Sequence, residues 1–240
     1  MTPALSVVIP FRDEAESLPI LYRELAAVID GLGIECEMIF VDDESRDDGV
    51  SLLLGIAGGD ERFRLISVSP HSGQSAALEA GFRAARGEWI ATLDADLQND
   101  PADLPRLLAE IEGADCVNGI RLDRQDLFMK RIASRVANSI RRRILGDSVE
   151  DVGCSLRVMR AKYLARIKLF RGSHRFLPIL LAFEGARVVE VSVSHRPRLH
   201  GKSKYAIADR LFEALLDLCA VAWMKKRISR YDFKELDRRQ

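Results

Sequence analysis

The chain has 240 residues, among them 36 basic and 36 acidic side chains that give a formal net charge of zero. This length can bury a sizeable core, and the balanced charge argues against a protein that binds nucleic acid through a global positive field. The four cysteines lie far apart without a C-x-x-C pair, so we assign them to a reduced core instead of a disulfide framework or zinc site.

Short apolar runs alternate with helical patterns through the first half of the chain. The runs are rich in β-branched residues and predict strands at 5–10, 37–43, 64–69 and 115–121, with a further strand that begins at Trp89. Apolar residues at helical spacing predict helices at 17–29, 49–56, 75–86 and 101–112. This alternation with short connections indicates an α/β fold with a mostly parallel sheet and helices on both faces. No dinucleotide or P-loop glycine motif follows a strand, which leaves those two nucleotide sites without their main support.

The pattern changes after Arg121. A basic amphipathic helix is predicted at 128–145, a turn and strand at 151–159, a helix at 176–183 and a strand at 187–195. A basic loop at 195–204 precedes a long apolar helix that begins at Tyr205. His174, His195 and His200 lack the spacing of a metal site, so we assign them to structure or loops.

Polar side chains occupy every second position where the fourth strand ends. Asp94, Asp96 and Gln98 would project to the same side if the backbone stays extended. The carboxyl ends of parallel strands are where open α/β sheets bind ligands. Two carboxylates and a carbonyl oxygen suit Mg²⁺ or Mn²⁺, particularly when a diphosphate supplies the remaining ligands. A D-x-D pair alone is a weak signal, and its place at the end of a strand strengthens it.

Six motifs, in order, resemble glycosyltransferase family 2, and more narrowly its dolichol-phosphate mannose synthase branch. They are V-V-I-P-F-R-D-E, V-D-D-E-S-R-D-D, G-Q-S-A-A-L-E-A-G-F, D-A-D-L-Q-N-D-P, D-V-G-C-S-L-R and R-P-R-L-H-G-K-S-K-Y. The resemblance covers about residues 5–228 and implies the GT-A fold with C-terminal amphipathic helices. It implies a catalytic domain at 1–204 and a C-terminal helix and charged tail at 205–240 within the same structural unit. The implied reaction transfers a hexose, with inversion, from a GDP- or UDP-sugar to a polyprenyl phosphate, with Mg²⁺ or Mn²⁺ as cofactor.

The resemblance also implies roles for individual residues. It places the nucleotide sugar at Pro10, Arg12, Glu14, Asp42, Asp43, Gln74 and Asp94. The metal would be held by Asp96 and Gln98, and the acceptor phosphate by Arg121, Lys130 and Ser134. The implied catalytic set is Asp94, Asp96 and Arg121, together with Arg198 and Lys202 on a loop that covers the diphosphate.

Two departures from the family pattern concern base preference and acceptor affinity. The usual P-x-Y-N-E reads P-F-R-D-E here, so Arg12 replaces an aromatic contact in the nucleotide pocket. Lys130 stands where arginine is common, and lysine lacks the bidentate fork of arginine.

The nature of the acceptor decides whether the reaction needs a general base. A lipid monophosphate has a second pKa near ~6, so it is mostly dianionic at pH 7 and needs positioning by cations. A sugar hydroxyl, the alternative acceptor, would need a carboxylate base, for which Asp151 is the candidate. Asp151 could equally form a turn or pair with a neighbouring arginine, and both interpretations stay open. A non-catalytic nucleotide-sugar-binding protein is the third hypothesis, against which the intact D-x-D motif argues.

The helix from Ile207 to Met224 carries more apolar surface than one packing face requires. Its strongly polar residues include an acidic stripe at Asp209, Glu213 and Asp217, and a basic collar follows at 225–227. Asp217 makes insertion across a bilayer costly, no stretch reaches ~20 apolar residues, and the first residues lack a secretory signal. We expect a peripheral protein on the cytoplasmic face of a membrane, bound to the lipid surface or a membrane-protein partner. A helix buried in its own domain or in a homodimer contact stays open.

Overall fold

The fold is built on one mixed seven-stranded sheet in the order β3-β2-β1-β4-β6-β5-β7. The computed structural model describes residues 3–121, 138–197 and 207–228. The strands are β1 (Leu5–Phe11), β2 (Cys36–Asp42), β3 (Phe63–Ser67), β4 (Trp89–Thr92), β5 (Cys116–Arg121), β6 (Arg157–Arg160) and β7 (Val188–Val193). The expected α/β class with a mostly parallel sheet is confirmed.

One strand runs against all the others. The parallel pairs are β1 with β2 and β4, β2 with β3, and β5 with β7. β6 lies between β4 and β5 and is antiparallel to both. The other six strands therefore point the same way, and the loops that follow β1, β2 and β4 meet at one edge of the sheet. We call it the carboxyl edge.

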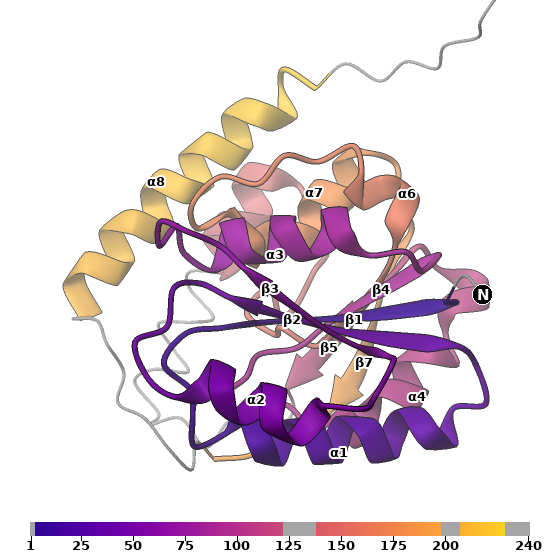
Figure 1. The fold of residues 1–240 in the computed structure, drawn as a ribbon. Coiled ribbons are helices and arrows are strands. Elements are labelled where there is room, and N and C mark those ends of the chain that lie inside the picture. The colour runs from indigo at the N-terminus through magenta and orange to yellow at the C-terminus, as the bar shows by residue number, and fades with distance from the viewer. Residues whose placement is uncertain (1–2, 122–137, 198–206, 229–240) are drawn as a thin grey trace, which may run out of the picture.

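Helices cover both faces of this sheet (Figure 1). One face packs against α1 (Leu18–Gly31), α2 (Gly49–Ala57) and α4 (Leu104–Leu108), which contribute buried leucines such as Leu21, Leu53 and Leu107. The other packs against α3 (Gln74–Ala84), α6 (Ala161–Leu164) and α7 (Leu177–Phe183). The buried sides of β1, β2 and β4 join these two cores, because successive side chains of a strand point to opposite faces.

A third apolar cluster lies beyond the sheet. It joins a helical segment at 138–145, α7 and α8 (Ile207–Lys225) through Leu145, Val149, Phe176, Ile179, Leu180, Leu218 and Val221. In the part of the chain that the structure describes, none of the helices combines the length and the apolar character that crossing a bilayer requires.

Three sequence predictions need correction. The helix expected at 101–112 is broken into α4 and two short 3-10 turns, η1 (Pro101–Asp103) and η2 (Ile111–Gly113). Pro105 has no N–H to bond the carbonyl four residues earlier, which disfavours a continuous helix there. The core assignment is right for three cysteines and wrong for Cys219, which is exposed on α8.

The third correction concerns the D-x-D segment. β4 ends at Thr92, so Asp94, Asp96 and Gln98 follow in a loop and not in an extended strand. Burial still alternates along this loop: Leu93, Ala95 and Leu97 are buried, and the three polar residues are half-buried. The apolar side chains anchor the loop in the core, and the polar ones are left towards solvent.

Candidate active site

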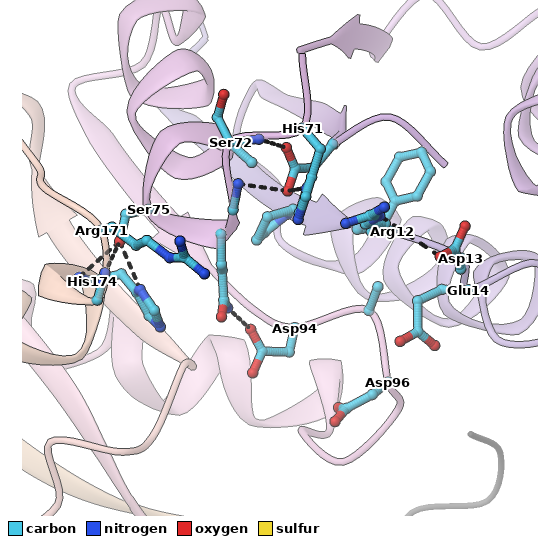
Figure 2. A pocket seen from close by; sticks show the side chains of 18 of the residues that line it. Arg12, Asp13, Glu14, His71, Ser72, Ser75, Asp94, Asp96, Arg171 and His174 are labelled. Carbon is cyan, nitrogen blue, oxygen red and sulfur yellow. Dashed lines mark hydrogen bonds and ion pairs between the residues drawn. The ribbon is translucent and has the colours of Figure 1, made fainter. Parts of the chain in front are cut away.

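A cavity of about 840 Å³ opens at the carboxyl edge of the sheet. The structure brings to its lining seven of the predicted site residues, namely Pro10, Arg12, Glu14, Asp43, Gln74, Asp94 and Asp96. In Figure 2, Asp94 lies between a group that includes Arg12 and Glu14 on one side and a group that includes Arg171 and His174 on the other. The cavity therefore has two different walls with carboxylates between them.

Each of the loops that follow β1, β2 and β4 at the carboxyl edge contains a residue other than glycine in the left-handed backbone region. These residues are Asp13 after β1, Glu44 after β2 and Leu97 after β4, with φ values of 54°, 59° and 61°. Such conformations cost of order 1–3 kcal/mol each and cluster at functional sites. Hydrogen bonds to the loop after β2 hold Asp13, whose carboxylate accepts from the Arg46 amide at 2.7 Å and whose amide donates to Ser45 Oγ at 3.0 Å.

Asp43 fastens the loop before α3 to the end of β2. Its carboxylate is only 4% exposed and accepts the amides of Ser72 at 2.8 Å and Gly73 at 2.9 Å. His71 Nδ1 lies 2.7 Å from Asp43 Oδ2. Asp42, its predicted companion, instead accepts the Ser45 amide at 2.9 Å and is not among the cavity-lining residues. Of the two acidic residues, only Asp43 reaches the cavity.

Arg12 offers an unsatisfied donor at the same wall. Its Nε is buried and has no hydrogen-bond partner within the described ranges, although Asp13 Oδ2 lies 3.7 Å away. A buried N–H without a partner costs free energy, which a ligand acceptor would relieve. Arg12 thus replaces the aromatic contact of the family pattern with a charged donor.

Asp94 and Asp96 form a pair of carboxylates in one cavity. Gln74 Nε2 donates to Asp94 Oδ1 at 2.7 Å. Burial, and then the charge of Asp96, raise the pKa of Asp94. A divalent cation would relieve both effects, so this hard oxygen set fits Mg²⁺ or Mn²⁺. The structure shows no cluster of three or more His, Cys, Asp or Glu suited to a metal among the residues it describes, so ligand oxygens would have to complete the coordination.

Gln98, the other predicted metal ligand, does not line the cavity. Its backbone N–H donates to Asp96 Oδ1 at 3.2 Å, and its carbonyl accepts the Arg196 amide at 2.8 Å. Gln98 therefore orients Asp96 through its main chain. Metal ligation by its side chain stays a prediction.

Arg121 and Asp151, predicted for the acceptor phosphate and for a base or turn, bind each other. Arg121 Nε lies 2.7 Å from Asp151 Oδ2 and Arg121 Nη2 lies 2.8 Å from Oδ1, a bidentate pair. Asp151 also accepts the amide of Gly153 at 3.1 Å. Burial opposes the charge of Arg121, but the bond to Asp151 prevails and raises the pKa of the guanidinium. Neither residue lines the cavity that contains Asp94.

His174 enters the opposite wall as a neutral ring. Its Nδ1 lies 2.8 Å from Ser75 Oγ, which also accepts the amides of Gly172 at 3.1 Å and His174 at 3.4 Å. The hydroxyl's single hydrogen is therefore directed to Nδ1, and the ring proton resides on Nε2. Burial, followed by the nearby charges of Arg175 and Arg157, lowers the pKa of His174 to about 3.

A second cavity of about 280 Å³ adjoins the first, because Pro10, Gln74, Asp94, His174 and Arg175 line both. Arg157 lines only this smaller cavity and donates to Asn118 Oδ1 and to the carbonyls of His174 and Val152. All three partners are neutral, so burial lowers the pKa of Arg157. Its positive charge remains available to the region around Asp94.

Four predicted residues, Lys130, Ser134, Arg198 and Lys202, lie outside the described residues. The sequence analysis missed Arg171 and Arg175 and assigned His174 to structure or loops, although all three line the main cavity. The one local signal is the compact basic segment R-G-S-H-R that precedes an apolar helix. Such a segment is ordinarily a solvated turn, so only its position in space identifies it.

The sequence relationships agree with this geometry. The model of glycosyl transferase family 2 matches residues 6–168, more than half of the chain. The chain belongs to glycosyltransferase family 2. It is accordingly a glycosyltransferase, as the six motifs predicted.

Two curated relatives are similar in sequence to most of this chain. The dodecaprenyl-phosphate galacturonate synthase of Rhizobium johnstonii is 38% identical over 228 residues, which cover 92% of this chain and 67% of the relative. The undecaprenyl-phosphate 4-deoxy-4-formamido-L-arabinose transferase of Edwardsiella ictaluri is 38% identical over 216 residues, which cover 89% and 66%. The chain spans about two thirds of the length of these relatives.

Solved structures share the GT-A fold at lower identity. Glucosyl-3-phosphoglycerate synthase from Mycobacterium tuberculosis with Mn²⁺, UDP and phosphoglyceric acid superposes with a TM-score of 0.69 at 19% identity, covering 95% of this chain and 80% of that one. The complex of the same enzyme with Mg²⁺ and UDP superposes with a TM-score of 0.68 at 18% identity, covering 91% of this chain and 80% of that one. At these identities the likeness concerns the fold alone.

Proposed function

We propose that this enzyme transfers a hexose, with inversion, from a GDP- or UDP-sugar to a polyprenyl phosphate. The observation that carries the proposal is the pair Asp94 and Asp96 in a cavity whose other lining includes Arg12, Asp43 and Gln74. Two relatives that are 38% identical act, by their names, on dodecaprenyl and undecaprenyl phosphates. An acceptor of the same class fits a chain with the same motifs.

The donor would lie along the cavity with its nucleoside against Pro10, Arg12 and Asp43 and its diphosphate near Asp94 and Asp96. Mg²⁺ or Mn²⁺ held by Asp96, beside Asp94, would act as a Lewis acid that neutralises the departing diphosphate. Solved relatives in fold contain Mn²⁺ or Mg²⁺ with UDP. Gln74 fixes the rotamer of Asp94 through its 2.7 Å hydrogen bond, which keeps that carboxylate directed into the cavity.

The acceptor phosphate needs no base in this scheme. A dianionic phosphate oxygen attacks the anomeric carbon, the bond to the nucleoside diphosphate breaks, and the product is a sugar phosphodiester plus the nucleoside diphosphate. Asp151, the base candidate for a hydroxyl acceptor, has its carboxylate occupied by Arg121 and by the Gly153 amide. This occupancy favours the phosphate acceptor over the hydroxyl.

A direct assay tests the proposal. Purified protein is incubated with Mn²⁺, a panel of GDP- and UDP-hexoses and a short polyprenyl phosphate, and the products are identified by mass. We expect one nucleotide sugar to yield a polyprenyl-phosphate sugar. Transfer to glycan hydroxyls but not to the lipid phosphate, with a loss of ~10²-fold or more in Asp151→Asn, would establish the alternative acceptor. Binding of a nucleotide sugar without turnover on any acceptor would support the third hypothesis, a non-catalytic nucleotide-sugar-binding protein.

We also propose that α8 and the helical segment at 138–145 bring the protein to a membrane surface. Apolar side chains on them face outward: Ile140, Ile144, Leu215, Leu216 and Trp223 are 46% to 63% exposed. Lys225, Lys226 and Arg227 follow as an exposed basic collar, which anionic lipids attract. Flotation with anionic vesicles at low salt tests this role. Absence of binding, or binding unchanged by deletion from Leu211, would contradict it.

A further inference from the structure

Two arginines lie on the wall opposite the nucleotide residues. The guanidinium groups of Arg171 and Arg175 line the main cavity, yet neither makes a hydrogen bond or ion pair with any residue that the structure describes. Arg121, the cation predicted for the acceptor phosphate, is neutralised by its bidentate pair with Asp151. Two carboxylates are near these arginines, since Asp217 interacts electrostatically with Arg175 and Glu213 lines the same cavity, but neither lies within ion-pair distance of Arg171 or Arg175. A dianion placed in this cavity would therefore meet an exposed guanidinium at Arg171 and a half-buried one at Arg175, whereas the guanidinium of Arg121 is already bonded to Asp151.

The backbone around these arginines is held in place without using their charge. Gly172 adopts a φ of +90°, and a methyl group in place of its hydrogen would lie 2.2 Å from Asp217 Oδ2 of α8. The Gly172 and His174 amides donate to Ser75 Oγ, at the start of α3. The turn between Arg171 and Arg175 is thus clamped between α3 and α8, which fixes the direction in which both side chains leave it.

Exposed apolar side chains lie along α8, beyond this wall. Glu213 lines the cavity, and Leu216 and Trp223 follow it at three and ten residues, so they share one side of the helix. Leu216 is 54% exposed and Trp223 is 63% exposed. From Glu213 to Trp223 the helix rises by about 15 Å. A ligand with an anionic head at the arginines and an apolar tail along α8 matches this arrangement.

We infer that Arg171 and Arg175 bind the phosphate head of an isoprenoid monophosphate, whose first isoprene units follow Leu216 and Trp223. This inference rests on the proposed transfer to a polyprenyl phosphate and assigns the head-group site to residues other than Arg121, Lys130 and Ser134. The location suits the reaction, because His174 and Arg175 also line the smaller cavity with Asp94. The phosphate would approach the donor from the wall opposite the nucleoside.

The test measures two ligands on the same variants. Binding of geranyl phosphate is titrated calorimetrically to the full chain in the presence of Mn²⁺ and UDP or GDP, whichever binds, and nucleotide binding is measured separately. We expect Arg171→Ala and Arg175→Gln each to lower the affinity for geranyl phosphate by about tenfold, since each substitution removes a charge-assisted hydrogen bond. Nucleotide affinity should change by less than about twofold, which also shows that the variants are folded.

Arg187→Ala is the matched control. Arg187 is an exposed arginine just before β7, at the edge of the sheet opposite the cavity. Its substitution removes the same charge and should change neither affinity. Titrations with geraniol and with inorganic phosphate separate the contributions of the apolar tail and of the phosphate head. The two arginine variants should lower the affinity for inorganic phosphate and leave the affinity for geraniol unchanged.

Four results would overturn the inference. Unchanged affinity for geranyl phosphate in both variants would place its head elsewhere. An equal loss of nucleotide affinity would assign the arginines to the donor diphosphate, and a loss confined to donors whose sugar carries a carboxylate would assign them to the sugar. A wild-type chain that transfers sugar to a polyprenyl phosphate, with the same KM for that acceptor in both variants, would overturn this inference alone. Failure of the wild type to transfer at all would overturn the proposed function.

Discussion

The two walls of the cavity are built in different ways. On the nucleotide wall, formed by Pro10–Glu14, Asp43 and His71–Gln74, the carboxylates that shape the loops are bonded to backbone amides of neighbouring loops. On the opposite wall, formed by Arg171–Arg175 and Glu213, the two guanidinium groups have no ion pair within the described ranges, and α8 exposes apolar side chains. The carboxylates of the nucleotide wall are therefore bonded internally, and its one unsatisfied donor among the described residues is Arg12 Nε, whereas the opposite wall presents two guanidinium groups without such bonds.

This difference indicates which interactions fix the conformation of each wall. Internal hydrogen bonds arrange the nucleotide wall before a donor arrives, which reduces the entropy lost on binding. On the opposite wall, Arg171 and Arg175 have no ion pair among the described residues and α8 exposes apolar side chains, so both features are available to an outside ligand. We therefore expect substitutions of the bonded carboxylates on the nucleotide wall to affect stability and donor affinity together. Substitutions of Arg171, Arg175 and the exposed apolar side chains of α8 should affect acceptor and membrane binding alone.

Substitution of a carboxylate between the two walls should have the largest effect on the rate of transfer. Asp96→Ala removes a charged ligand of the proposed cation, and we expect the rate of transfer with Mn²⁺ to fall by at least about 100-fold. EDTA should produce a similar loss in the wild type. Asp30→Ala, which removes an exposed aspartate at the end of α1, is the control and should retain activity. Near wild-type turnover in EDTA would contradict the metal assignment.

Asp43→Ala removes the carboxylate that fastens the loop before α3 to the end of β2. Because the amides of Ser72 and Gly73 lose their acceptor, we expect the free energy of unfolding in urea to fall by about 1–3 kcal/mol. Affinity for UDP or GDP, measured by titration, should fall as well, whereas affinity for geranyl phosphate should change little. If acceptor and nucleotide affinities fall equally, the two walls are not independent.

His174 gives the opposite wall a pH dependence. Its folded pKa of about 3 lies below the unfolded value near 6.5, so below pH 6.5 the unfolded chain binds a proton that the folded chain does not. The contribution to stability is full above pH 6.5 and is lost as the pH falls. Between pH 6.5 and 5.0 we expect His174 to cost about 2 kcal/mol of unfolding free energy. Urea unfolding of His174→Asn should show a smaller decline, and identical pH profiles would refute the burial of a neutral ring.

The smallest effect should come from the outward side of α8. Leu216→Ser with Trp223→Ser should reduce flotation with anionic vesicles several-fold and change unfolding free energy by less than about 0.5 kcal/mol, because both side chains are exposed. Leu218→Ser is the matched contrast, since Leu218 is 7% exposed in the third cluster and its loss should destabilise the fold. Unchanged flotation of the double variant would remove α8 from the membrane contact.

The sequence by itself determined the sheet and the nucleotide wall. Apolar periodicity located the strands, and polar residues directly after β1, β2 and β4 indicated the carboxyl edge, because parallel strands end together. Pro10, Asp43, Asp94 and Asp96 reach the cavity from those strand ends. The family followed from motifs at the same positions, since the chemistry depends on short local segments.

Only the tertiary structure decided what those local patterns do not encode. It placed β6 antiparallel between β4 and β5, ended β4 at Thr92, and paired Arg121 with Asp151, which lies 30 residues away. It also brought Arg171 and His174 to the cavity of Asp94 through packing of α3, α7 and α8. The physical reason is that periodicity encodes the conformation of one segment, whereas contacts between distant segments depend on strand order and on which apolar faces pack together.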